Sequence, residues 1–334
     1  MTHDPRRILL TGGAGFIGSN LVHHLLATDP DVHIVDLDAM TYAASPANLA
    51  NLPDPDRHTL VEGDITDLGL VDALLRDHDI DTVVHLAAES HVDRSICGPA
   101  VFVQSNVVGT YTLLEAARAA WQDHGVADGR SHRFHHVSTD EVYGDLSPDD
   151  PPFTEDTPYR PSSPYSASKA ASDHLVRAWA RTYGLPVTLS NCSNNYGPRQ
   201  HTEKLIPVVI RSCLERRGIP VYGKGENIRD WLYVTDHCAA IDTIVRRGAD
   251  GETYLVGADN EWKNLDLVKL LCRIVAEELE VDPSETLSLI GFVTDRPGHD
   301  RRYAVDGTRT RALGWAPTRT FEAGLRETVR WYLR

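Results

Sequence analysis

Two short stretches of the chain bring together side chains that can transfer protons. Residues 138–144 contain a hydroxyl at Thr139, followed by two adjacent carboxyls at Asp140 and Glu141. Residues 165–169 contain a phenol at Tyr165 and an amine at Lys169. Neighbouring carboxyls can divide into one acid and one base when their surroundings separate their pKa values. Without the phenol and the amine nearby, the Asp-Glu pair would fit a helix cap or a solvated turn better than an active site.

The spacing of Tyr165 and Lys169 indicates that the amine could affect the pKa of the phenol. Residues four apart share one face of a helix, and the segment from Pro164 to Tyr183 has the pattern of a helix. An ammonium close to a phenol favours the phenolate and lowers the phenol pKa from its usual value of about 10. We therefore expect Tyr165 to act as a base near neutral pH, although the same spacing occurs in many helices that have no catalytic role.

The elements around these residues predict where they meet. The apolar residues before Ser138 indicate a strand, so Thr139, Asp140 and Glu141 should emerge at the carboxyl edge of a sheet, where open α/β sheets bind ligands. A short apolar strand over residues 7–10 runs into a glycine-rich turn and then a helix, an order typical of a dinucleotide site. The cofactor contacts expected at that turn are Gly12, Gly15, Phe16, Ile17 and Gly18.

The strands that follow predict the rest of a cofactor site. An apolar strand over residues 32–35 leads to Asp36 and Asp38, a little over about 20 residues past the glycines, where an acidic residue binds the ribose. Asp38 is better placed, and a carboxylate there repels a 2′-phosphate, so we expect NAD rather than NADP; Asp36 stays an open alternative. Asn106 fits either a cofactor contact or a structural crosslink. Later strands end in the cofactor candidates Asp64, Ile65, Leu86, Ala87 and Ala88.

Composition narrows the class of protein. The 334 residues include 33 Lys plus Arg and 48 Asp plus Glu, and the formal net charge of −15 argues against nucleic acid or an anionic membrane as a partner. Five cysteines without a C-x-x-C pair or zinc spacing to histidine predict free thiols in a reducing cytoplasm and no metal site. The polar start and the lack of about 18 consecutive apolar residues predict neither a signal peptide nor a transmembrane helix.

The chain resembles the extended short-chain dehydrogenase/reductases, and within them the nucleoside-diphosphate-glucose 4,6-dehydratases. The resemblance spans nearly the whole chain and is carried by TGGAGFIGS (11–19), LAAESHVDRS (86–95), STDEVYG (138–144), YSASK (165–169), NCSNNYGPRQ (191–200) and DRPGHDRRYA (295–304). The Thr-Asp-Glu run is the specific motif, whereas the glycine turn and the Tyr-Lys pair occur across the wider superfamily. The resemblance implies an α/β fold: a Rossmann-type doubly wound parallel sheet that binds NAD, in residues 1–190 with a later contribution from about 232–256. It also implies a smaller, mixed α/β substrate-binding domain in residues 191–334.

The resemblance also implies a reaction on a nucleotide-sugar, with dTDP-glucose as the expected substrate. Tyr165, assisted by Lys169, would take the proton of the sugar C4 hydroxyl, oriented by Thr139, while hydride passes from C4 to tightly bound NAD. Glu141 would then remove the C5 proton, and Asp140, whose pKa burial must raise, would protonate the departing C6 hydroxyl. The hydride would return to C6 and give a 4-keto-6-deoxy product. Thymine versus uracil as the base stays open.

Further implications concern substrate contacts, assembly and rival activities. A homodimer is implied, through helices in residues 101–120 and 165–183. A nucleotide-sugar 4-epimerase would share NAD, Tyr165 and Lys169 but needs no acid and base at C5 and C6, so Asp140 and Glu141 argue against it. Residues 43–46 lack the Gly-Asn pair that is usual in the family, which leaves fine contacts to the cofactor open. The expected substrate contacts are Ser90, Thr139, Asn194, Lys204, Leu205, Tyr222, Arg229, Asn264, Arg296 and His299.

Overall fold

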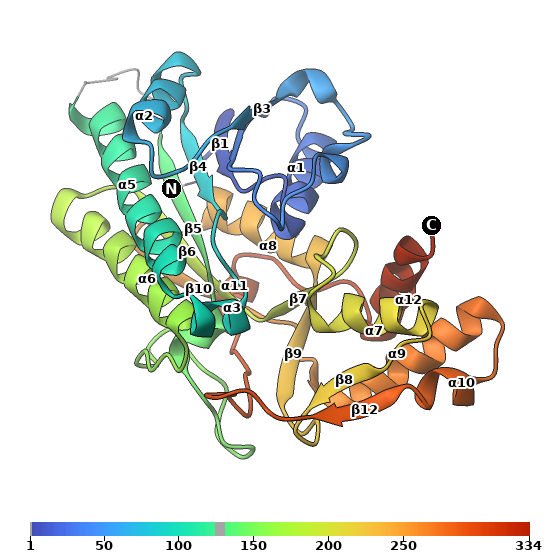
Figure 1. The fold of residues 1–334 in the computed structure, drawn as a ribbon. Helices are drawn as coiled ribbons and strands as arrows, with labels where there is room; N and C mark the ends of the chain where they lie inside the picture. The colour runs from blue at the N-terminus through green and yellow to red at the C-terminus, as the bar shows by residue number, and fades with distance from the viewer. Residues whose placement is uncertain (1, 124–130) are drawn as a thin grey trace.

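The computed structural model describes residues 2–123 and 131–334 of the chain (Figure 1). Its largest feature is a sheet of seven strands: β1 (Arg7–Thr11), β2 (His33–Asp38), β3 (His58–Glu62), β4 (Thr82–His85), β5 (Arg133–Thr139), β6 (Val187–Cys192) and β10 (Thr253–Val256). The strand order is β10-β6-β5-β4-β1-β2-β3, and every neighbouring pair is parallel. The predicted doubly wound parallel sheet is therefore confirmed, and its order reverses at β1, where such sheets bind ligands.

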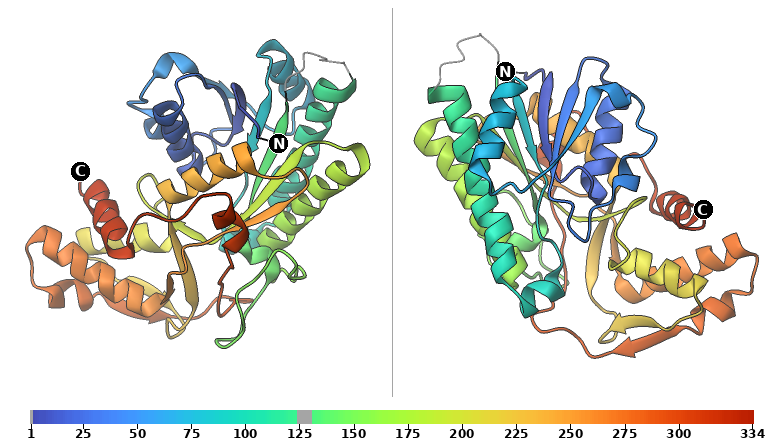
Figure 2. Two further views of the ribbon diagram at one scale, coloured as in Figure 1. Left: turned by 180° about the vertical axis from the view of Figure 1, so that it is seen from behind. Right: turned by 45° about the horizontal axis from the view of Figure 1, so that its top comes forward.

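Five helices cover the two faces of this sheet: α1 (Phe16–Thr28), α2 (Leu68–Asp77), α5 (Gly109–Arg118), α6 (Pro164–Tyr183) and α8 (Val234–Arg247). Figures 1 and 2 show α1 and α8 on one face and α2, α5 and α6 on the other. Successive side chains of a strand point to opposite faces, so Leu9 of β1 joins the core under α2, α5 and α6, while Ile8 and Leu10 join the core under α1 and α8. Strands β4, β5 and β6 are buried along their whole length because both faces are covered.

The two stretches that could transfer protons lie where the sequence predicts them. Strand β5 ends at Thr139, and a single 3₁₀ turn (Asp140–Tyr143) follows it at the carboxyl edge of the sheet. Helix α6 begins at Pro164, where the side chains of Ser163 and Ser166 form a reciprocal capping box that holds its first turn.

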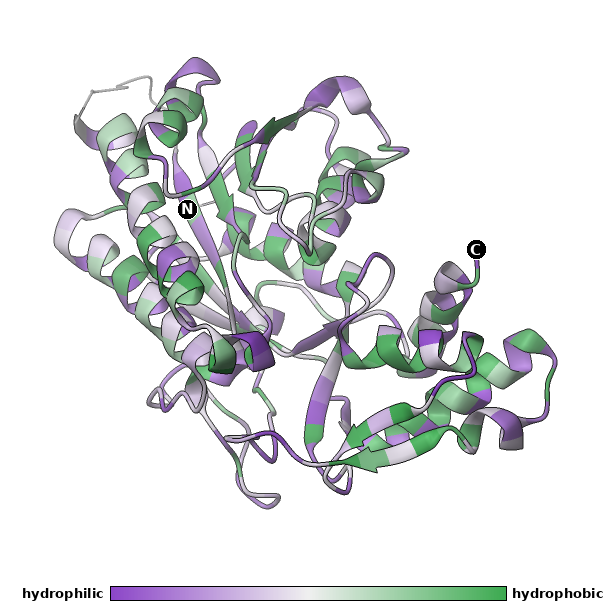
Figure 3. Ribbon diagram, in the orientation of Figure 1, coloured by the Kyte–Doolittle hydropathy of each residue, from purple (hydrophilic) through white to green (hydrophobic). Residues whose placement is uncertain are grey.

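The later part of the chain builds a second, smaller unit below the sheet in Figure 1. Its strands are β7 (Asn194–Tyr196), β8 (Ile219–Tyr222), β9 (Ile228–Tyr233), β11 (Glu261–Lys263) and β12 (Ile290–Val293). Its helices are α7 (Leu205–Leu214), α9 (Asn264–Leu279), α10 (Pro283–Leu287) and α12 (Phe321–Tyr332). Strands β11, β9 and β7 form one small sheet and β12 pairs with β8. Apolar residues run along β8 and β12 in Figure 3, and the helices pack on their own apolar core.

The stretch of residues 92–123, in which helix was expected over 101–120, is helical but composite. It contains α3 (Val92–Cys97), α4 (Ala100–Phe102), a π-helical segment (Val103–Val108), α5 and a second π-helical segment (Ala119–Asp123). π-helical turns are often found at functional sites, and the first of these carries Asn106. The remaining helical elements are 3₁₀ turns at Pro46–Leu49 and Pro55–Arg57, and α11 (Thr308–Ala312). No helix in the described part of the chain is long and apolar enough to cross a membrane.

Candidate active site

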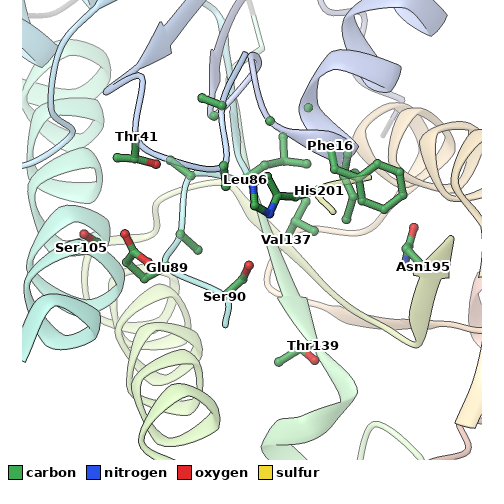
Figure 4. A pocket seen from close by; sticks show the side chains of 18 of the residues that line it. Phe16, Thr41, Leu86, Glu89, Ser90, Ser105, Val137, Thr139, Asn195 and His201 are labelled. Carbon is green, nitrogen blue, oxygen red and sulfur yellow. The ribbon is translucent and has the colours of Figure 1, made fainter. Parts of the chain in front are cut away.

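A cavity of about 350 Å³ extends along the carboxyl ends of the central strands. The turn after β1, the loops after β2 and β4, the end of β5, the start of α6 and the segment between β6 and α7 all contribute to its wall. In Figure 4, Phe16, Leu86, Ser90, Thr139 and Asn195 border one common space, although they come from distant parts of the chain. The cavity therefore joins the carboxyl edge of the large sheet to the smaller unit.

All five residues expected to do chemistry line this cavity: Thr139, Asp140, Glu141, Tyr165 and Lys169. The Thr139 hydroxyl donates to Asp140 Oδ1 at 3.3 Å and accepts from the Glu141 N–H at 3.3 Å. These contacts fix the direction in which the two adjacent carboxyls leave the strand. The other oxygen of Asp140, Oδ2, is buried and has no hydrogen-bond partner among the described residues.

The surroundings of the two carboxyls differ. Burial, followed by the neighbouring Glu141, raises the pKa of Asp140 well above its ordinary value. Burial also raises the pKa of Glu141, but the cations of Arg296, Arg229 and Lys204 act against that rise. Two carboxyls whose pKa values are separated in this way can serve as one acid and one base. Burial and the neighbouring Glu141 thus favour the protonated form of Asp140.

In the free protein, the expected lowering of the Tyr165 pKa by Lys169 is not seen. Burial and the nearby Glu141 raise the pKa of Tyr165 well above its ordinary value. The amine of Lys169 donates instead to the carbonyl oxygen of Val137 at 2.9 Å and lies 3.4 Å from His136 Nε2. Burial also lowers the pKa of Lys169 to about 8. Helical spacing places the two side chains on one face of α6, but it says nothing about the depth at which they are buried.

The glycines of the turn after β1 have no side chains, so an anion can approach the backbone N–H groups of this turn. A Cβ at Gly18 would lie 2.1 Å from the carbonyl oxygen of Gly12, and a Cβ at Gly12 (φ +79°) would lie 2.9 Å from the backbone of Ala87. The turn can therefore pack against β4 and α1 only with glycine at these positions. All ten further cofactor candidates from this turn and from the strand ends line the cavity: Gly12, Gly15, Phe16, Ile17, Gly18, Asp64, Ile65, Leu86, Ala87 and Ala88.

The alternative between Asp36 and Asp38 is decided by their contacts. Strand β2 continues to residue 38, so both carboxylates lie within it. Asp36 is fully buried, accepts from the Gly13 N–H at 2.9 Å and lies 3.4 Å from His58 Nε2, outside the cavity wall. Asp38 lines the cavity and accepts from the N–H groups of Ala14 and Met40. Asp36 thus supports the glycine turn, and Asp38 is the carboxylate that a ligand can reach.

With this geometry in place, comparison with known proteins identifies the family. The sequence profile of the GDP-mannose 4,6-dehydratase family matches residues 9–328. The chain belongs to the GDP-mannose 4,6-dehydratase family. The protein named dTDP-glucose 4,6-dehydratase 1 in Escherichia coli (strain K12) is 54% identical over 336 residues, which cover 98% of this chain and 92% of that protein. The resemblance inferred from the motifs is confirmed.

Solved structures agree with this family assignment. The dTDP-glucose 4,6-dehydratase of Streptomyces venezuelae with NAD bound matches this dehydratase-family chain with a TM-score of 0.88 at 47% identity, covering 98% of this chain and 97% of that one. The UDP-glucose 4-epimerase of Thermotoga maritima with UDP-glucose matches with a TM-score of 0.85 at 28% identity, covering 98% of both chains. Dehydratase and epimerase therefore share this fold, and residues of the site must distinguish the two activities.

The expected substrate contacts of this dehydratase-family member fall into two groups. Ser90, Thr139, Asn194 and Lys204 line the cavity, while Leu205, Tyr222, Arg229, Asn264, Arg296 and His299 do not. Two residues of the second group contact one carboxylate, Asp93, which accepts from the hydroxyl of Tyr222 at 3.1 Å and lies 3.7 Å from Arg296. The His299 ring contacts that of Tyr222 edge-on.

Arg229 has a structural task that the sequence did not reveal. Its guanidinium donates to the carbonyl oxygens of Ile228 and Asp300 and lies 4.1 Å from the ring centroid of Tyr303. It is 5% exposed. Arg229 therefore ties the segment after β12 to β9, while its charge still acts on Asp140 and Glu141.

Asn106, expected as a cofactor contact, lies outside the cavity wall. Its amide accepts from the Glu89 N–H at 2.8 Å and donates to the Glu89 carbonyl oxygen at 3.0 Å and to the Ser168 hydroxyl at 2.8 Å. All of its hydrogen-bonding groups thus have protein partners, and it crosslinks the loop after β4 to α6. Of the two interpretations of Asn106 that the sequence allowed, the structural crosslink describes these contacts.

Several cavity residues from the end of β6 to the start of α7 were not predicted from the sequence: Cys192, Ser193, Asn195, Gln200, His201 and Glu203. Strand β6 runs to Cys192 and pairs that residue with Thr139 of β5. Parallel neighbours end at the same edge of a sheet. The polar residues that directly follow an apolar strand could therefore have indicated that this segment lines the cavity.

Proposed function

We propose that this protein is a hydro-lyase, a dTDP-glucose 4,6-dehydratase that uses tightly bound NAD. The single observation that carries this proposal is the pair Asp140 and Glu141 at the end of β5, which lines the same cavity as Tyr165 and Lys169. A pair of carboxyls with separated pKa values supplies the acid and the base that loss of water requires. The relatives named dTDP-glucose 4,6-dehydratase, 54% and 53% identical to this chain, support the same substrate.

The residues at the β1 end of the cavity fit NAD. The glycine turn leaves backbone N–H groups free of side chains at the N-terminus of α1, where a pyrophosphate is favoured. Asp38 would hold the ribose hydroxyls, and its charge would repel the extra phosphate of NADP. When bound, NAD accepts the hydride from C4, returns it to C6 and brings a positive charge into the cavity.

Tyr165 and Thr139 would act on the C4 hydroxyl of the sugar. Thr139 would orient that hydroxyl, and Tyr165 would take its proton as the hydride leaves C4. The raised pKa of Tyr165 in the free protein means that its proton is held until positive charge enters the site. In this proposal the cofactor supplies that charge and adds to the charge of Lys169, which is already present. Tyr165 then becomes a base only when the site is loaded.

Glu141 and Asp140 would carry out the elimination. Oxidation at C4 acidifies the C5 proton, which Glu141 would remove as a base. Asp140 would give its proton to the C6 hydroxyl as water departs, and its raised pKa favours the protonated form that this step needs. The cations of Arg296, Arg229 and Lys204 favour the ionised form of Glu141, which suits the base of the pair.

One assay tests the proposal directly. Purified protein incubated with dTDP-glucose should form the 4-keto-6-deoxy sugar nucleotide without net consumption of NAD, because the hydride is returned. UDP-glucose and GDP-mannose, assayed side by side, would rank the nucleotides. Formation of the C4 epimer alone would refute the dehydratase proposal and favour an epimerase, whose fold is shared.

Asp140→Asn should lower turnover of dTDP-glucose by about 10²- to 10⁴-fold, because an amide cannot protonate the leaving hydroxyl. In the unaltered protein the proton of Asp140 is needed, so turnover should fall as the pH rises through the raised pKa of this carboxyl. A substrate analogue with fluoride in place of the C6 hydroxyl needs less protonation and should restore much of the rate. Equal loss with both substrates would contradict the acid role of Asp140.

Three further proposals concern the domain organisation, the oligomeric state and the cellular location of this protein. We propose that residues 1–190 with about 232–256 bind NAD and that residues 191–334 mainly bind the nucleotide. A homodimer would cover apolar side chains that are exposed along α4, α5 and the π-helical segment between them: Val101, Val103, Val108 and Tyr111. A cytoplasmic location would suit the five free cysteines.

A further inference from the structure

Behind Lys169 lies a carboxylate that the proposed mechanism does not use. Asp173 follows Lys169 by one turn of α6 and is fully buried, while Lys169 is 4% exposed. One nitrogen of His136 lies close to both groups: its Nε2 is 3.4 Å from the Lys169 amine and 3.3 Å from Asp173 Oδ1. We propose that Asp173 is a positioning residue that keeps Lys169 protonated through its negative charge, beside the Nε2 atom of His136.

The proposal rests on the proposed function, since the charge of Lys169 matters because it favours the phenolate of Tyr165. A buried ammonium without an opposite charge loses its proton readily. Burial indeed lowers the pKa of Lys169 to about 8, and Asp173 is the first group that acts against this fall. The structure therefore balances a large desolvation cost with one nearby carboxylate.

Among the described groups that shift the pKa of Lys169 or lie beside it, Asp173 is the only one that carries a negative charge in the free protein. His136 on β5 and His85 on β4 stay neutral because burial lowers the pKa of His136 to about 4 and that of His85 well below its ordinary value. Cys192 on β6 stays a thiol, since burial raises its pKa to about 12. On α6 itself, Tyr165 holds its proton in the free protein. None of these groups can replace the charge of Asp173.

Hydrogen bonds hold Asp173 in its ionised form. Its Oδ2 accepts from the Tyr159 hydroxyl at 2.7 Å and from the Asn191 amide at 3.0 Å. Burial alone would raise its pKa, but the contacts with His136 and Lys169 leave the pKa of Asp173 below its ordinary value. Hydrogen bonds to a carboxylate favour its charged form. The acceptor of these bonds is thus held in place as an ion, one turn away from Lys169.

The pKa of Lys169 can be measured directly because the chain has five lysines: Lys169, Lys204, Lys224, Lys263 and Lys269. The free protein, labelled with ¹³C at lysine Cε, would be titrated by NMR, and Lys169→Met would assign the signal. Asp173→Asn should lower the pKa of Lys169 by at least about one unit, as loss of a close opposite charge does. Asp173→Ser is the second uncharged variant, with the same expected fall, should the amide prevent folding.

Two controls separate charge from structure. Asp236→Asn removes another buried carboxylate, which accepts from Thr318 Oγ1 and the Arg319 N–H and is not among the groups that act on Lys169, so it should lower the melting temperature without moving the Lys169 titration. Tyr159→Phe removes a donor to Asp173 but keeps its charge, so the pKa of Lys169 should stay within a few tenths of a unit.

Activity provides an independent readout. Because charged Lys169 is needed, the alkaline limb of the kcat profile should move to lower pH in Asp173→Asn and return in Asp173→Glu. An unchanged Lys169 pKa in a folded, uncharged variant would overturn the proposal. The titration uses no substrate, so it tests the role of Asp173 even if the protein shows no activity with dTDP-glucose. Normal activity with dTDP-glucose would not offset an unchanged Lys169 pKa in the variant.

Discussion

Glu141→Gln is expected to stop water loss while oxidation at C4 continues. The glutamine has nearly the same shape but cannot take the C5 proton, so product formation should fall by about 10²- to 10⁴-fold, the usual contribution of a general base. Glu141 faces the cations of Arg296, Arg229 and Lys204, and the uncharged amide should leave these cations without their anion. The protein should still bind NAD, because the glycine turn and Asp38 lie at the other end of the cavity.

The measurement follows the C5 proton. In D₂O the unaltered protein should yield a product with deuterium at C5, whereas Glu141→Gln should show no exchange at C5 and a 4-keto sugar that keeps its C6 hydroxyl. Glu155→Gln is the matched control, since Glu155 pairs with Arg309 and lies outside the cavity wall. Unchanged turnover in Glu141→Gln would remove this residue from the mechanism.

Tyr165→Phe should block the reaction at its first step. The variant keeps the ring that packs edge-on against Phe102 but loses the hydroxyl that takes the C4 proton. Turnover should fall by about 10²- to 10⁴-fold. Unlike Glu141→Gln, this variant should leave the sugar unoxidised at C4.

Deuterium at C4 of the substrate distinguishes the two variants. The unaltered protein should deliver this label to C6, and Tyr165→Phe should leave it at C4. Tyr196→Phe serves as the control, because its hydroxyl is also buried but donates to the carbonyl oxygen of Phe321 in the smaller unit. Transfer of label to C6 by Tyr165→Phe at a normal rate would assign the base to another residue.

The local sequence pattern was sufficient to predict those elements of this protein whose structure depends on neighbouring residues in the chain. Apolar strands followed by glycine or acidic residues predicted the sheet edge, and a helix opened by residues 163–165 and ending at Tyr183 was predicted close to its observed bounds. The turn after β1 could be predicted because glycine is required wherever backbone approaches backbone, as Gly18 and Gly12 do. Such constraints act within a few residues and are therefore visible in sequence.

Tertiary structure decided what depends on burial and on long-range partners. Asp36 and Asp38 are alike in sequence, yet the first holds the glycine turn and the second faces the cavity. Asn106 crosslinks a loop to α6, and in the free protein Lys169 contacts Val137 and His136 while burial keeps the pKa of Tyr165 raised. The sequence by itself determined which groups can do chemistry and on which elements they lie. The fold decided their pKa values and partners, because desolvation and contacts across strands are properties of the packed chain.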